Sequence, residues 1–172
     1  MKTSLVYGRA ATTCFLLLNA TALIAATPKF GPKGNSLIGE WKADKTATGG
    51  SGVCGFHFDL DQHVIIRTNH AELSAGAPAH NDLMVLFPDS APDKAKAAYY
   101  DNEGHVIDYG AEWSADGNTL TFLSKPGPGP QFRLIYKTSE PQIFEVTFEM
   151  APPGQPAGFR VYTSGRIHRI SK

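Results

Sequence analysis

Four residues with metal-ligand chemistry lie close together in the first half of the chain: His57, Asp59, Asp61 and His63. In an unbroken β-strand their odd spacing would place all four side chains on one face, because successive side chains alternate between the two faces. Imidazoles and carboxylates gathered on one face are typical of a metal site. Residues 59–62, however, predict a tight turn that breaks the strand and separates the four groups. We therefore expect exposed turn residues here and no metal site.

The sequence gives little support to nucleophilic catalysis. It contains no Gly-x-Ser-x-Gly elbow. Cys54 lies in an apolar stretch without a neighbouring cation that would lower the pKa of its thiol, so we expect a small buried hydrophobic residue. His105 and His168 are candidates for the general base of a hydrolase or isomerase. We assign no catalytic residue.

Most of these residues fall in or beside predicted β-strands. The clearest strand covers residues 142–150, where Phe144 and Phe148 share one face and Glu145 and Glu149 share the other. A similar alternation predicts four further strands, and a shorter pattern predicts the first strand of the domain. These five segments are 62–69, 105–113, 118–124, 132–137 and, for the first strand, 37–44.

The segments between these strands are rich in turn signals. Residues 101–104 and 115–118 combine Asp or Asn with Gly and predict hairpin turns. Residues 45–52 predict a loop. In the region 71–98, residues 83–87 fit either a buried strand or a short helix, and residues 93–98 have helix propensity.

The whole pattern predicts an all-β fold with about eight to ten strands and at most one short helix. The 17 Gly and 12 Pro residues suit short strands that are joined by turns. Consecutive strands with short connections pair with their neighbours, and a sheet of this size removes its exposed edges by closing. We therefore predict a single up-and-down antiparallel β-barrel.

The first 26 residues have the features of a secretory signal peptide. Lys2 and Arg9 supply a positive start, an apolar run follows, and Ala25 and Ala26 supply small residues for cleavage. Cleavage would leave a lead-in at 27–36, expected to be flexible, and a barrel domain at 37–172 without a membrane span. We expect a secreted or periplasmic protein, with an uncleaved anchor as the alternative. The 16 basic and 16 acidic residues create no field that would attract nucleic acid.

Gly39-Glu40-Trp41 on the predicted first strand resembles the Gly-x-Trp signature of lipocalins and related calycin barrels. In those families the Trp closes one barrel end and a basic residue of the last strand packs across it, which implies that role for Arg166 or Arg169. Residues 99–107 and 148–154 are similar to segments of secreted bacterial lipocalin-like proteins of unknown function. The other usual lipocalin motifs and the lipocalin disulfide are missing. The resemblance implies a lipocalin-like barrel.

Two further resemblances concern ligands. Arg160 and Tyr162 resemble the Arg-x-Tyr pair with which intracellular fatty-acid-binding barrels hold a carboxylate, and the alternative is a structural Arg and a packed Tyr at the rim. His168 lies late in the chain, as does the iron ligand of one haem-binding calycin family. That family carries a glycine-rich repeat where this chain has residues 42–44. We expect no cofactor, with haem through His168 as the alternative.

The sequence favours a binding module over an enzyme. A barrel of eight or more strands can enclose one small apolar or amphipathic ligand. The alternatives are a periplasmic enzyme with a histidine base, and a structural envelope protein with a filled core and an exposed apolar patch. The predicted ligand-binding residues are Trp41, Tyr109, Trp113, Tyr136, Phe148, Arg160 and Tyr162.

Overall fold

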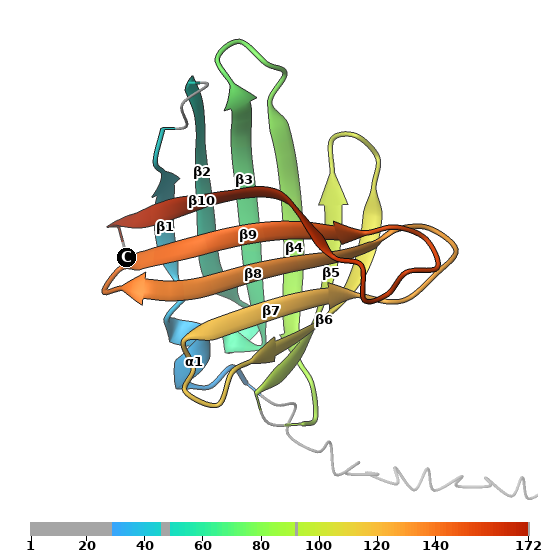
Figure 1. Ribbon diagram of the computed structural model, residues 1–172. Helices are drawn as coiled ribbons and strands as arrows, with labels where there is room; N and C mark the ends of the chain where they lie inside the picture. The colour runs from blue at the N-terminus through green and yellow to red at the C-terminus, as the bar shows by residue number, and fades with distance from the viewer. Residues whose placement is uncertain (1–28, 46–48, 92, 172) are drawn as a thin grey trace, which may run out of the picture.

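The protein folds into one closed antiparallel β-barrel of ten strands, in which each strand pairs with its neighbours in sequence and β1 pairs with β10 (Figure 1). The computed structural model describes residues 29–45, 49–91 and 93–171. The strands are β1 (Gly39–Ala43), β2 (Gly49–Asp59), β3 (Val64–Ser74), β4 (His80–Pro88), β5 (Lys94–Asp101), β6 (Val106–Trp113), β7 (Thr119–Ser124), β8 (Gln131–Glu140), β9 (Ile143–Ala151) and β10 (Arg160–Ser171). The predicted up-and-down barrel is confirmed.

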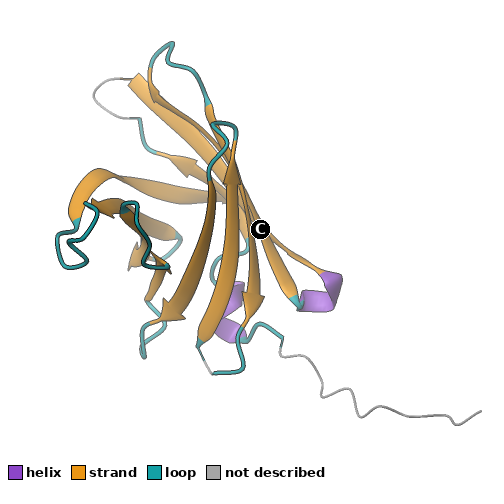
Figure 2. Ribbon diagram, turned by 90° about the vertical axis from the view of Figure 1, so that its right-hand side faces the viewer, coloured by secondary structure: helices purple, strands orange, loops and turns teal. Residues whose placement is uncertain are grey.

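Two short helical segments lie at the same end of the barrel (Figure 2). They are α1 (Pro32–Asn35) and the 3-10 turn η1 (Leu60–Gln62). No helix among the residues that the structure describes is long and apolar enough to cross a membrane. The predicted signal peptide at 1–26 lies outside the described residues.

One end of the barrel is closed by packed side chains, and we call it the closed end. Phe30 and Leu37 are buried there, and the Phe30 ring meets the Trp113 ring in an edge contact with centroids 6.2 Å apart. Lys33 of α1 forms an ion pair with Asp93 at 2.9 Å. Residues 29–36 of the expected lead-in are thus tied to the barrel, because Phe30 buries its ring in it.

Trp41 and Arg169 form the centre of this closed end. The Arg169 guanidinium lies 4.4 Å from the centroid of the Trp41 ring, and it donates to the carbonyl groups of Ser36 and Ile38. The Trp41 Nε1 donates to the Leu37 carbonyl at 2.8 Å. Of the two basic residues expected to pack across Trp41, Arg169 does so.

Two segments differ from the prediction, and a third settles an alternative that the sequence left open. The expected loop at 45–52 ends early, because β2 already begins at Gly49 and pairs with the end of β3. Residues 93–98 form no helix and belong to β5. There Ala95 and Ala97 are buried while Lys94 and Lys96 are exposed, so the period-2 pattern overrides the helix propensity of Ala and Lys. Residues 83–87, which fitted either a strand or a short helix, form a strand within β4.

Candidate functional site

The opposite end of the barrel, which we call the open end, carries polar side chains that point into the interior. They come from three consecutive strands and form what we call the polar wall. Strand alternation turns them inward, because each shares its face with buried apolar residues such as Ile65 and Leu86. The register aligns Asn69, Asp82 and Asp101 in one row across β3, β4 and β5. The polar wall consists of Arg67, Asn69, His80, Asp82, Tyr99 and Asp101.

A buried ion pair is the deepest part of the polar wall. Arg67 Nη1 donates to Asp82 Oδ1, and the two side chains are only 8% and 4% exposed. Asn69 Nδ2 donates to Asp82 Oδ2 at 2.8 Å. Burial opposes the charge of Arg67, but attraction to Tyr136 and Asp82 raises the pKa of the guanidinium, so that it stays charged. A buried pair of this kind adds little net stability, so it favours a functional role for the polar wall.

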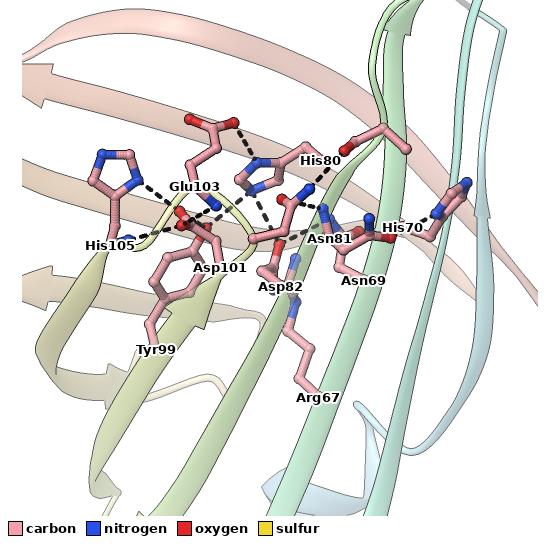
Figure 3. A network of polar contacts seen from close by, with 12 residues as sticks. Arg67, Asn69, His70, His80, Asn81, Asp82, Tyr99, Asp101, Glu103 and His105 are labelled. Atoms are coloured by element: carbon pink, nitrogen blue, oxygen red, sulfur yellow. Dashed lines mark hydrogen bonds and ion pairs between the residues drawn. The ribbon is translucent and has the colours of Figure 1, made fainter.

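A chain of hydrogen bonds continues from Asp82 to the loop between β5 and β6 (Figure 3). The Tyr99 hydroxyl donates to Asp101 at 3.1 Å, and its oxygen lies 3.0 Å from His80 Nε2. His80 Nε2 is also 3.5 Å from Asp82, and Nδ1 is 3.1 Å from Glu103. Both ring nitrogens of His80 are therefore engaged by protein groups. Burial is the main cause that raises the pKa of Tyr99, so its hydroxyl keeps its proton.

Asp101 organises the loop at this end. Its Oδ1 accepts the backbone N–H groups of Glu103 and His105, and its Oδ2 lies 2.8 Å from the His105 ring. Although burial works against the charged form, these hydrogen bonds lower the pKa of the Asp101 carboxyl below its ordinary value. Gly104 supplies the positive φ of +90° that the predicted turn requires.

Opposite the polar wall, strands β8–β10 carry aromatic side chains at the open end. We call this the aromatic wall: Phe132, Phe148 and Tyr162. The Phe132 and Phe148 rings are stacked with centroids 5.8 Å apart, and Tyr162 meets Phe148 at 6.0 Å. Phe132 and Phe148 are only partly buried, and the inward-facing Met150 is 38% exposed. Solvent therefore reaches the inner face of the barrel at this end.

Below both walls, aromatic rings in edge contact fill the interior and form a floor. The contacts run from Tyr99 to Tyr109, then to Phe122, Tyr136 and Phe144, with centroids 6.0–6.3 Å apart. Phe144 packs against Trp41 at 4.4 Å. The floor separates the open end from the closed end.

The predicted ligand-binding residues are divided between these regions. Trp41, Tyr109, Trp113 and Tyr136 are at most 6% exposed and lie in the packed interior. Phe148 lies in the aromatic wall.

Arg160 and Tyr162 lie at the start of β10, where a bulge interrupts the pairing with β9. Both are exposed, and Tyr162 is 65% exposed, so the two residues stand at the rim of the open end. The rim position was the alternative to a carboxylate-binding Arg-x-Tyr pair inside the barrel. Cys54 is buried, as predicted, and burial raises the pKa of its thiol to about 11.

The histidines have different surroundings. His168 lies on the outer face of β10 beside Asp44, because its neighbours Ile167 and Arg169 point inward. An iron inside the barrel is therefore out of its reach. His105 is exposed beside Asp101, while His80 points into the open end. η1, which contains Asp61, breaks the strand between Asp59 and His63. Within the described ranges no three His, Cys, Asp or Glu side chains are placed to hold a metal.

Two hollows lie on the barrel wall. One, of about 320 Å³, lies between β4 and β5 and reaches Asp82 and Asp101 of the polar wall. The other, of about 910 Å³, extends along β5–β7 and includes the exposed outer-face residues Phe87 and Leu123. The Asp82 and Asp101 side chains stay buried beside the smaller hollow, at 4% and 3% exposed.

The polar wall was not predicted from the sequence, although the sequence carries a signal for it. Arg67, Asp82 and Asp101 occupy inward positions at the same end of three consecutive strands whose other inward positions are mostly apolar. A polar residue at such a position breaks the alternation that predicts a strand. The signal becomes visible once the bounds and register of β4 and β5 are known.

Comparison with known proteins supports the fold of this chain and gives no information about its function. No family model matches the sequence, and no curated protein matches it. The crystal structure of Rv2717c from M. tuberculosis is similar, with a TM-score of 0.59 and 15% sequence identity, and the match covers 82% of this chain and 99% of that chain. The two chains share a barrel fold. At this identity the likeness carries no information about ligand or activity.

Proposed function

We propose that this protein is a lipocalin-like binding protein that takes up a small amphipathic molecule at the open end of its barrel. The observation that carries the proposal is the presence of two unlike walls on opposite sides of the barrel at its open end. Stacked aromatic rings, Phe132 and Phe148, lie on one side, and a hydrogen-bonded polar network around Asp82 lies on the other. Sites for small ligands combine a mainly apolar lining with a few fixed polar groups in this way.

The exposure of the aromatic wall supports this proposal. At the closed end the inward-facing Trp41 and Phe144 are at most 5% exposed, whereas Phe148, on the same face of β9 as Phe144, is only partly buried. An apolar ligand portion laid against Phe148 would remove that ring from water. Full burial of a Phe side chain is worth about 1.5–3 kcal/mol, which is enough to contribute strongly to binding.

The test uses Nile red, an uncharged amphipathic dye whose fluorescence rises in apolar surroundings. We expect the purified barrel domain to bind the dye, and Phe148→Ala to weaken the binding about tenfold, which corresponds to about 1.4 kcal/mol. The matched control is Val53→Ala, since Val53 is 41% exposed on the outer face of β2. Absence of dye binding, or equal weakening by both variants, would contradict the proposal.

We also propose that the barrel acts outside the cytoplasm after loss of residues 1–26. The charge and apolar pattern of that segment support this. The mass and N-terminal sequence of the protein produced in its own host provide the test, with Thr27 expected as the first residue. A protein that retains the segment would contradict it.

A further inference from the structure

Arg67 has a hydrogen-bond donor that the protein leaves unused. Its Nη1 pairs with Asp82, but its Nε is buried and has no hydrogen-bond partner among the described residues. The side chain as a whole is 92% buried, since only 8% of it is exposed. A buried N–H without an acceptor is unfavourable, so this position suits an acceptor atom that comes from outside the chain.

Arg67 also lies where such an acceptor would meet both walls. It projects from β3 into the interior and interacts with Tyr136 of β8 on the far side of the barrel. Phe132 lies on the same inward face of β8, four residues before Tyr136, and Leu134 between them pairs with Phe148. The guanidinium is therefore at the inner end of the aromatic wall.

The carboxylates of the polar wall have little capacity left for a cationic ligand. Asp101 accepts two backbone N–H groups, the Tyr99 hydroxyl and the His105 ring. Asp82 is contacted by Arg67, Asn69 and His80. An ammonium group would have to displace one of these donors.

A negatively charged ligand group is also disfavoured at this position. The charge of Arg67 is already balanced by Asp82, whose side chain is 4% exposed. Asp101, 3% exposed, and Glu103 add further negative charge nearby. Like charges repel strongly where water is excluded, so a second carboxylate beside Asp82 is unfavourable.

We propose that the ligand carries an uncharged acceptor, the carbonyl oxygen of a ketone, ester or amide, which accepts a hydrogen bond from Arg67 Nε. This inference rests on binding at the open end. The carbonyl enters first and reaches the floor, and the apolar remainder lies along Phe132 and Phe148 towards the rim. Arg67 and Asp82 together then select an uncharged head group over an ammonium or a carboxylate.

The experiment compares three unbranched compounds that have the same number of carbon atoms: 2-undecanone, undecylamine and undecanoate. Each compound is titrated against bound Nile red at pH 7.5, below its solubility limit or micellar concentration, and the displacement of the dye is measured. We expect the ketone to displace the dye at a concentration about tenfold lower than either charged compound, because a hydrogen bond to a charged donor has roughly that effect on binding. Equal or tighter binding of either charged compound overturns the inference.

Arg67→Lys tests the donor itself. Lysine keeps the positive charge beside Asp82 but has no Nε–H in the arginine position. We expect ketone binding to weaken about tenfold in this variant, while undecylamine changes by less than about twofold. Unchanged ketone binding overturns the inference.

Asp82→Asn provides a second variant that tests the charge argument if Arg67→Lys does not fold. Without the carboxylate, the guanidinium charge is uncompensated, so undecanoate should gain about tenfold relative to the ketone. No gain overturns the inference. If Nile red is bound but the ketone does not displace it, the head-group assignment alone fails; if the dye does not bind at all, the binding site itself fails.

Discussion

The closed end and the open end of this barrel are formed by the same strands, yet their interiors differ in chemistry. On β9, Phe144 faces the closed end and is 5% exposed, while Phe148, four residues later on the same face, is only partly buried. On β3, Ile65 is fully buried, whereas Arg67, two residues later, carries a charge. Backbone pairing is continuous through both regions. The comparison teaches that the closed end supplies stability and the open end holds groups that stability alone would not select.

Trp41→Ala at the closed end should have the largest effect on stability. The substitution removes a fully buried ring, its contact with Arg169 and its hydrogen bond to Leu37. We expect the free energy of unfolding to fall by about 5 kcal/mol, measured by urea denaturation. Trp41→Phe keeps most of the packing and should lose about 1–2 kcal/mol. A small effect of Trp41→Ala would show that this end is not the main source of stability.

At the open end, Arg67→Met should lower the free energy of unfolding by about 3–4 kcal/mol, because it leaves the Asp82 carboxylate buried without its partner. The double variant Arg67→Met with Asp82→Leu should recover most of this loss, since an apolar pair replaces an ion pair at little cost. Urea denaturation of both variants measures the difference. A double variant as unstable as the single one would show that the pair itself stabilises the fold.

Asp101→Asn should change how stability depends on pH. The pKa of Asp101 is lowered in the folded protein, so its ionised form stabilises the fold above the ordinary Asp pKa of about 3.9. That contribution is lost as the pH falls through the lowered value. We expect the variant to lose about 1.5–3 kcal/mol at pH 7 and to show a flatter decline of stability between about pH 5 and pH 2.

Asp116 provides the matched comparison for Asp101 at the closed end. It also accepts hydrogen bonds, from Ser114 and Asn118, and these lower its pKa, but it lies in an exposed turn. Asp116→Asn should therefore flatten the pH profile less than Asp101→Asn, because solvent screens its interactions. Chemical denaturation at a series of pH values measures both. An equal effect of the two variants would remove this distinction between the ends.

Phe148→Ala should have the smallest effect on stability, although it is expected to weaken dye binding. The ring is only partly buried, so we expect a loss of about 1 kcal/mol in the free energy of unfolding. Phe144→Ala, on the same strand and face, should lose about 3–4 kcal/mol because that ring is packed against Trp41 and Tyr136. Thermal unfolding of both variants is the measurement. Equal losses would mean that the aromatic wall is part of the core.

Much of the fold was open to prediction because a strand with one buried face alternates in sequence. The strand around Phe144 and the turn at Gly104 agree with that pattern. β5 was harder to predict from the sequence, since Lys94–Ala98 contains residues with helix propensity. Only the pairing with β4 and β6 shows that the small side chains of Ala95 and Ala97 fit the barrel interior. The burial of Phe30 was hidden for a related reason, because a lone ring among Pro, Gly and Lys has no periodicity.

The sequence by itself determined the antiparallel barrel and the burial of Cys54, because these follow from local alternation, turn chemistry and residue type. The packing of a basic residue on Trp41 was implied by the resemblance to lipocalins. Only the tertiary structure decided which polar residues meet. Arg67, Asp82 and Asp101 are separated by many residues, and the register of β3, β4 and β5 brings them together. Register depends on pairing along whole strands, and a shift of one residue would turn these groups to the other face of the sheet. The polar wall at the open end therefore depends on the pairing of several strands and not on any single segment.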